Sequence, residues 1–225
     1  MIIIHLGGSI VVSKEIQTSF LGEFREFLLK FLKEGKKFVV VVGGGTICRD
    51  YQNAAASIID ISDEDKDWIG IHATRLNAQL LRAIFFDVAH PVVLDSPMKE
   101  IGDEEKYNLF IASGWRPGSS SDYVAVMLAK RFHTKKIIIA TKVPYVYEED
   151  VEKNGNAAAL KKLSWAKYRQ MVGDRWVPGL RAPVDPVASK LAEELGLEAV
   201  VIQGTNVENF ENVLRNKSFI GTVIK

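Results

Sequence analysis

The sequence lacks the features that mark secreted, disulfide-bonded and membrane-spanning proteins. It contains one cysteine, Cys48, which excludes an internal disulfide framework and fits a reducing compartment. Its apolar start, residues 1–12, carries no basic leader and is broken by Gly7 and Gly8 well short of a membrane span. We therefore expect a cytoplasmic protein that has no membrane partner, with its first strand at residues 2–6.

An excess of charge of one sign is also missing. The chain has 29 basic and 28 acidic residues, for a formal net charge of +1. This balance gives no electrostatic footprint for nucleic acid, so we expect no nucleic-acid partner, and any anion site must be local. No repeat or linker stands out in the 225 residues, a length that buries roughly 70% of the unfolded surface. We expect a single domain, residues 1–225.

The most informative stretch is residues 38–51, which read FVVVVGGGTICRDY. Strand-forming residues at 38–42 run into three glycines, and helical spacing begins at about Thr46 and continues to about Ser57. Backbone N–H groups at such a strand, turn and helix junction can face an anion. The spacing is that of neither a nucleotide-binding P-loop nor a dinucleotide fingerprint. The stretch therefore predicts a phosphate-binding loop of another kind.

Strands and helices alternate along the rest of the chain. This pattern predicts a mostly parallel sheet that is covered by helices on both faces. We expect strands at residues 2–6, 38–42, 91–94, 108–112, 136–141, 198–202 and 219–224, and helices at about 20–32, 46–57, 65–89, 122–132, 165–172, 185–195 and 207–214.

Three junctions between a strand and a helix are small and polar: residues 7–9, 43–45 and 114–121. Loops at the carboxyl ends of parallel strands share one edge of a sheet, so these three can converge on one ligand. The alternative is that the glycines only turn the chain, but three such loops favour phosphate binding. Arg49 can clamp a phosphate or be an ordinary surface charge. Ser119, Ser120, Ser121 and Asp122 can equally be helix caps, and Asp67 and His72 helix surface residues.

Taken together, the motifs resemble the amino acid kinase superfamily, and specifically the archaeal type of uridylate (UMP) kinase. The matching segments are HLGGS at 5–9, VVGGGTICRDY at 41–51, DWIGIHATRLNAQLL at 67–81, GWRPGSSSD at 114–122 and VDPVASK at 184–190. They span most of the chain in the order found in the family. Relatives that phosphorylate isopentenyl phosphate or fosfomycin carry histidine before the triple glycine, where this chain has Val42.

The resemblance implies a three-layer α/β/α fold, a homohexamer built as a trimer of dimers, and transfer of the γ-phosphate of ATP, with Mg²⁺, to UMP. The acceptor part is expected at about residues 1–130 and the nucleotide-donor part at about 131–225. The resemblance assigns UMP binding to Gly44, Gly45, Arg49, Asp67, Ser120 and Ser121, and ATP binding to Gly7, Thr141, Lys142, Tyr147 and Asp150. The residues that it implies for catalysis are Gly8 and Ser9, which with Gly7 would face the transferred phosphoryl group, and Lys190, which matches a lysine near the donor phosphates. It assigns no side chain to a metal.

The chain departs from the family pattern on the donor side. The usual Thr-Asn-Val-Asp-Gly-Val-Tyr segment reads TKVPYVY at 141–147, with Pro144 in place of the aspartate and Tyr145 in place of the glycine. His5 stands where many members of the superfamily have lysine. A second hypothesis therefore stays open: a non-catalytic relative that binds a nucleotide or an oxyanion for storage or regulation, as molybdenum storage proteins do on this fold.

Overall fold

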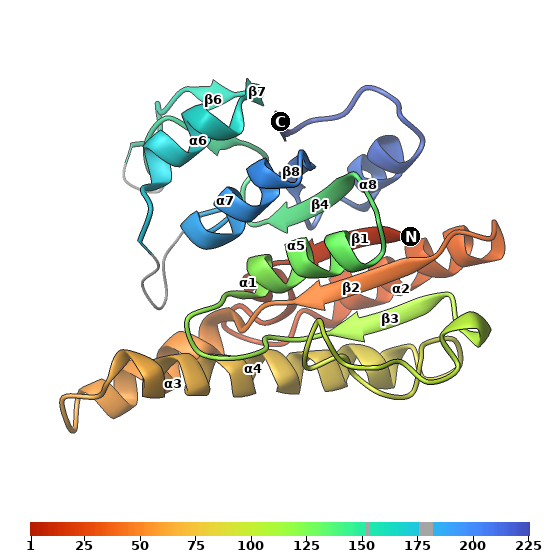
Figure 1. The fold of residues 1–225 in the computed structure, drawn as a ribbon, viewed down its shortest axis with the longest axis horizontal. Helices are drawn as coiled ribbons and strands as arrows, with labels where there is room; N and C mark the ends of the chain where they lie inside the picture. The colour runs from red at the N-terminus through yellow and green to blue at the C-terminus, as the bar shows by residue number, and fades with distance from the viewer. Residues whose placement is uncertain (152–153, 176–181) are drawn as a thin grey trace.

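Strands and helices alternate in the computed structural model, which describes residues 1–151, 154–175 and 182–225 (Figure 1). The strands are β1 (Ile2–Leu6), β2 (Phe38–Val42), β3 (Leu109–Ala112), β4 (Lys136–Thr141), β5 (Val146–Tyr147), β6 (Ala159–Leu160), β7 (Lys162–Leu163), β8 (Glu198–Gln203) and β9 (Thr222–Ile224). The α-helices are α1 (Gly8–Val11), α2 (Thr18–Lys33), α3 (Gly45–Ala56), α4 (Asp63–Ile84), α5 (Ser121–Arg131), α6 (Trp165–Val172), α7 (Pro186–Glu194) and α8 (Val207–Leu214), and a short 3₁₀-helix covers Glu104–Lys106.

Seven strands form one sheet in the order β3-β2-β1-β4-β8-β9-β7. All neighbouring pairs are parallel except β8 and β9, so the expected mostly parallel sheet is confirmed. The central strand β1 lies between β2 and β4, and its residue His5 is in register with Val41 and Ile139. The short strands β5 and β6 pair with each other outside this sheet.

Helices cover both faces of the sheet, which gives the three layers of the expected α/β/α fold. Alternate residues of β1 point to opposite faces: Ile4 and Leu6 pack with α2, α4 and α8, whereas Ile3 packs with α5, α6 and α7. In Figure 1, α5 and α7 lie in front of the sheet and α2 lies behind it. Because both faces are buried, β2 is apolar at every position, as its sequence FVVVV predicts.

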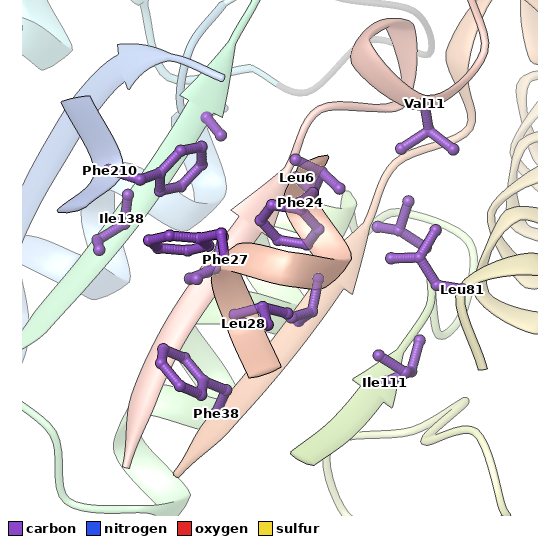
Figure 2. Packing of buried hydrophobic residues seen from close by; sticks show 14 of the residues in the cluster. Leu6, Val11, Phe24, Phe27, Leu28, Phe38, Leu81, Ile111, Ile138 and Phe210 are labelled. Atoms are coloured by element: carbon purple, nitrogen blue, oxygen red, sulfur yellow. The ribbon is translucent and has the colours of Figure 1, made fainter. Parts of the chain in front are cut away.

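Aromatic side chains of α2 and α8 fill the layer behind the sheet (Figure 2). Phe24 and Phe27 of α2 approach Phe210 of α8, with ring centroids 5.8 and 5.5 Å apart. Phe24 and Phe210 are fully buried. The apolar spacing of the α2 segment therefore predicted the face that this helix buries.

The longest of the described helices, α4, differs in its bounds from the expected 65–89. Ser62 caps it, because its hydroxyl accepts a hydrogen bond from the Asp65 backbone N–H at 3.1 Å, and the acidic residues that follow suit the positive end of the helix. The helix ends at Ile84, before the expected residue 89. In the described ranges, neither α4 nor another helix combines the length and the apolar character that crossing a membrane requires.

Two local predictions are wrong. The expected strand at 91–94 is reduced to an isolated bridge of Leu94 with Ala112, because Pro91 has no N–H to contribute to a ladder. The expected loop at residues 7–9 instead opens a short helix, α1, whose first residue is Gly8. The chain therefore leaves β1 through one helical turn.

Phe24→Ala tests the packing between α2 and α8. Truncating this fully buried ring leaves a cavity, so we expect the free energy of unfolding to fall by about 3 to 5 kcal/mol. Urea unfolding followed by circular dichroism measures the change. Phe86→Ala is the control, because Phe86 is 75% exposed and its loss is expected to cost less than about 0.5 kcal/mol. Equal losses in the two variants would contradict this assignment of the core.

Candidate functional site

The carboxyl ends of β1, β2 and β4 open into a cavity of about 730 Å³. The arrowheads of β2, β3 and β4 point to the same side in Figure 1, so the loops that follow these strands share one edge of the sheet. Residues 7–9, at the start of α1, and residues 43–45 and 119–121, which lead into α3 and α5, all contribute to the cavity wall. The predicted convergence of the three loops is therefore confirmed, and the volume suits a small-molecule ligand.

Two of these glycine loops touch through their backbones. A Cβ atom placed on Gly8 would lie 2.0 Å from the Gly45 nitrogen and 2.5 Å from the Gly43 carbonyl carbon. Gly45 also has a φ of +74°, in the left-handed region that favours glycine. Both positions therefore need glycine because no side chain fits between the loops. The contact brings the end of β1 against the start of α3.

Side chains of helix α4 form hydrogen bonds with the backbone of the cavity loops. The Asn77 amide donates hydrogen bonds to the carbonyl oxygens of Gly43 at 2.9 Å and Gly44 at 3.1 Å. The Thr74 hydroxyl accepts a hydrogen bond from the Gly114 N–H at 2.8 Å. Sequence reasoning missed both residues, although polar side chains among the apolar positions of α4 were a signal. Buried polar groups require partners, and here these partners are the cavity loops.

Arg49 and Asp67 lie on the α3–α4 side of the cavity, and both are half-buried. The Asp67 carboxylate accepts a hydrogen bond from the Gly118 N–H at 2.7 Å, so α4 also holds the loop at 114–121. Arg49 Nη2 lies 3.5 Å from the Thr46 hydroxyl, which keeps its guanidinium at the cavity wall. Cys48 lines the same part of the cavity. Burial raises the pKa of its thiol, so this cysteine stays protonated and unreactive near neutral pH.

The three serines before α5 differ in what their hydroxyls can do. Ser119 donates its proton to the Arg116 carbonyl oxygen at 2.7 Å. Ser120 is the N-cap of α5: its oxygen accepts from the Tyr123 N–H, and its proton goes to the Asp185 carboxylate. Ser121 differs, because its oxygen lies 2.9 Å from Nε2 of His5. The capping alternative therefore holds for Ser120, while Ser121 depends on a histidine.

His5, Asp122 and Asp185 form a buried ionisable cluster beside the cavity. His5 Nδ1 lies 3.0 Å from Asp122 Oδ1, and the other Asp122 oxygen accepts the Asp185 backbone N–H at 3.2 Å. The His5–Asp122 contact is an ion pair by distance, but the ring N–H is not aligned for a linear hydrogen bond. All three residues are more than nine-tenths buried. Sequence reasoning gave none of them a firm role.

Asp185 caps α7 and carries an unusual charge environment. Its Oδ1 accepts hydrogen bonds from the N–H groups of Val187 at 2.8 Å and Ala188 at 3.0 Å. Burial, and then the neighbouring Asp122 charge, raise the pKa of Asp185 to about 6. The segment before it is fixed by the buried Tyr168 hydroxyl, which donates to the Val184 carbonyl oxygen at 2.7 Å.

The loop after β4 forms the opposite wall of the cavity. The Thr141 hydroxyl donates to the Val143 carbonyl oxygen at 2.7 Å and so closes a turn. Tyr145 and Tyr147 both line the cavity, with their rings edge to face and their centroids 6.2 Å apart. Lys142 and Asp150 add charges of opposite sign to this wall. The arrangement offers aromatic and polar groups to one end of a ligand.

The structure brings almost all of the predicted site residues together. The residues that line the cavity are Gly7, Gly8, Ser9, Gly44, Gly45, Arg49, Asp67, Ser120, Ser121, Thr141, Lys142, Tyr147 and Asp150. Lys190 is the exception: it is exposed on α7 and outside the cavity wall. Its role stays a prediction. In the ranges that the structure describes, no group of three or more His, Cys, Asp or Glu side chains gathers to hold a metal ion.

The chain is similar to known proteins over most of its length. The model of the amino acid kinase family matches residues 1–203. The uridylate kinase of Methanothrix thermoacetophila is 33% identical over 211 residues, 93% of each chain, and that of Thermococcus sibiricus is 31% identical over 217 residues, 96% of each chain. The crystal structure of uridylate kinase from Archaeoglobus fulgidus superposes with a TM-score of 0.83 at 30% identity over the whole of both chains. A UMP kinase from Bacillus anthracis shares the fold, with a TM-score of 0.79 at 21% identity.

Asp185→Asn tests the buried charge. The amide retains an oxygen for the α7 cap but removes the negative charge beside Asp122. The native carboxyl holds its proton up to about pH 6, whereas an unfolded aspartate loses it near pH 4. The contribution of this group to stability therefore falls as the pH rises from about 4 to 6. We expect the variant to lose this fall, a difference on the order of 2 kcal/mol in the free energy of unfolding.

Urea unfolding at about pH 4.5, 6 and 7.5 measures the difference between the variant and the wild-type chain. Asp60→Asn is the matched control, because Asp60 is exposed and its loss should leave the pH dependence unchanged. Parallel curves for the wild-type chain and Asp185→Asn would show that Asp185 ionises equally easily in the folded and unfolded states, against this assignment.

Proposed function

Because the chain belongs to the amino acid kinase family, we propose that it is a UMP kinase, which transfers the γ-phosphate of ATP to UMP and releases UDP and ADP. The observation that carries the proposal is the backbone contact between the loops after β1 and β2. That contact lies between a wall formed by α3 and α4 and a wall formed by the loop after β4. Curated relatives named uridylate kinase match the chain over nearly its full length.

We assign UMP to the α3–α4 side, in the part of the chain up to about residue 130. Gly44, Gly45 and Arg49 hold its phosphate, since a planar guanidinium beside a helix start suits a phosphate dianion. Asp67 binds the ribose through an oxygen of its carboxylate. Ser121 offers a hydroxyl to the same phosphate, whereas Ser120 acts through its cap and its bond to Asp185.

ATP is assigned to the wall formed by Thr141, Lys142, Tyr147 and Asp150, in the part of the chain after about residue 131. The glycine loop at 7–9 then lies between the two nucleotides, where Gly7, Gly8 and Ser9 face the transferred phosphoryl group. Lys190 approaches the donor phosphates only if its long side chain turns from the surface of α7 towards the cavity. We retain it as a proposed donor-side charge.

In the proposed reaction the phosphoryl group passes directly from ATP to UMP, and the protein forms no covalent bond with it. A phosphate oxygen of UMP bonds to the γ-phosphorus of ATP while the bond from that phosphorus to the β,γ-bridging oxygen breaks. No general base is needed, because a phosphate monoester is largely ionised near neutral pH. The protein holds two anions in line and offsets their charge with Arg49 and backbone N–H groups. Mg²⁺ is proposed to arrive on the phosphates of ATP, its usual ligands together with water, and we derive no step through it.

The altered donor segment is compatible with this assignment. The family's usual glycine is Tyr145 here, but Tyr145 is not among the described non-glycine residues with positive φ, so the backbone does not need glycine at this position. The Thr141 hydroxyl closes the turn that precedes Pro144. Tyr145 adds an aromatic face beside Tyr147. Tyr145 therefore changes the lining of the donor wall at a position that does not require glycine.

We also propose a homohexamer built from dimers, located in the cytoplasm. Exposed apolar side chains on α3, on the turn after it and on α4 support an interface between copies. They are Tyr51, Ile58, Ile59, Trp68 and Leu76, with exposures between 40% and 81%. The lone cysteine fits a reducing compartment.

A coupled assay of ADP formation tests the proposed activity. We expect ADP to form from ATP in the presence of UMP and Mg²⁺, and much less to form with CMP or isopentenyl phosphate. Arg49→Ala should raise the KM for UMP by about ten- to one-hundredfold and leave the KM for ATP within about twofold, since a charge-assisted phosphate contact contributes about 1.5 to 3 kcal/mol.

Arg49→Lys is the matched control, because lysine keeps the charge but loses the bidentate geometry. The KM of this variant for UMP should lie between that of the wild-type chain and that of Arg49→Ala. Equal losses for UMP and ATP would mean that the acceptor and donor sides are assigned wrongly, and a larger loss for ATP would mean that the two walls are reversed. Binding of both nucleotides by calorimetry without ADP formation would instead support the non-catalytic alternative.

A further inference from the structure

Ser121 is the serine of the 119–121 loop whose proton is not committed to a carboxylate or a carbonyl oxygen. It is the first residue of α5, is half-buried and lines the cavity. In the described part of the chain, the hydrogen-bond partner of its oxygen is Nε2 of His5, at 2.9 Å. Whether this hydroxyl can donate to a ligand therefore depends on which nitrogens of the His5 ring carry a proton.

The other ring nitrogen of His5 faces a negative charge. Nδ1 lies 3.0 Å from Asp122 Oδ1, and this oxygen accepts no hydrogen bond among the residues that the structure describes. A lone pair on Nδ1 would repel the carboxylate, so the proton of a neutral ring belongs on Nδ1. Nε2 is then an acceptor, and it takes the hydroxyl proton of Ser121. In this state, Ser121 presents only lone pairs to the cavity.

One more proton on the pair reverses the hydrogen bond. A protonated ring donates from Nε2 to the Ser121 oxygen, which frees the hydroxyl proton to point into the cavity. The same result follows if the added proton sits on Asp122 and the ring proton moves to Nε2. The donating state of Ser121 thus requires one added proton on His5 and Asp122 together, whichever atom carries it.

We propose that His5 is a positioning residue for the acceptor. When the His5–Asp122 pair carries one added proton, the Ser121 hydroxyl turns towards the acceptor phosphate. Binding of that phosphate is therefore coupled to the uptake of a proton. The inference rests on the proposed UMP-binding function. It identifies Ser121, rather than Ser119 or Ser120, as the hydroxyl that donates to the phosphate.

The groups that surround His5 come from the sheet, from α5, α6 and α7, and from the far side of the cavity. Its sheet neighbours Val41 and Ile139 bring no charge. From α5 it faces Asp122, and beyond that carboxylate lie Asp185 at the start of α7 and the neutral hydroxyl of Tyr168 on α6. The cavity wall carries the cations Arg49 and Lys142 and the carboxylates Asp67, Glu148, Glu149 and Asp150. Asp122, at 3.0 Å, is thus the charged group in contact with His5, and a bound phosphate adds further negative charge.

Isothermal titration calorimetry of UMP into the full-length chain tests the inference. Titrations in two buffers of different ionisation enthalpy count the protons taken up, between about pH 7 and 8.5, where UMP itself is mostly dianionic. We expect the wild-type chain to take up a larger fraction of a proton than His5→Gln, and its Kd to rise with pH by at most about tenfold per unit. Ser121→Ala should lose the uptake although His5 is intact. His133→Asn is the matched histidine control, because His133 is exposed after α5 with a φ of 51° that asparagine tolerates.

The outcomes separate the possible failures. Proton uptake that is unchanged in His5→Gln overturns the proposal. Uptake that is lost in His5→Gln but retained in Ser121→Ala also overturns it, because His5 would then act by charge alone. Tight UMP binding without proton uptake in the wild-type chain overturns the inference and leaves the proposed function standing, whereas absence of UMP binding removes both. If His5→Gln does not fold, the Ser121→Ala result decides.

Discussion

The structure depends on the approach of two backbones, that of Gly8 after β1 and those of the glycines at 43–45 after β2. A side-chain atom on Gly8 would lie 2.0 Å from the Gly45 nitrogen, so the two loops meet without any space between them. This contact joins the segments that follow two adjacent parallel strands, at the point where α1 and α3 begin. The cavity opens at this edge of the sheet, and glycines of both segments line it.

Helix α4 holds this contact in place from outside the sheet. Its polar residues Thr74 and Asn77 are buried, and each is bonded to the backbone of a cavity loop. A buried amide or hydroxyl without a partner is costly, so these bonds couple the packing of α4 to the shape of the site. Asp67, on the same helix, accepts a hydrogen bond from the Gly118 N–H. One helix thereby positions two loops that are distant in sequence, those at residues 43–45 and 114–121.

The two buried carboxylates beside the cavity, Asp122 and Asp185, form an electrostatically unfavourable pair. Asp122 and Asp185 are close together and buried, and the pKa of Asp185 is raised to about 6 in consequence. Stability alone gives no reason to keep two carboxylates there. Asp122 instead lies 3.0 Å from His5 Nδ1, and Asp185 accepts the hydroxyl proton of Ser120, so both carboxylates contact residues that line the cavity. Strain of this kind is common at functional sites, where charge is arranged for binding rather than for folding.

The sequence by itself determined the alternation of strands and helices, the buried β2 and the glycine loops, because apolar periodicity and glycine act locally. The resemblance to the family pointed to Arg49 and Asp67, and both line the cavity, although their roles stay predictions. The prediction of a strand at 91–94 was wrong because Pro91 has no N–H to contribute to a ladder, and that signal is present in the sequence. Only the tertiary structure decided that Ser121 meets His5, 116 residues away, and that Lys190 lies outside the cavity. Side-chain partners across elements are set by packing, and no pattern within one segment encodes them.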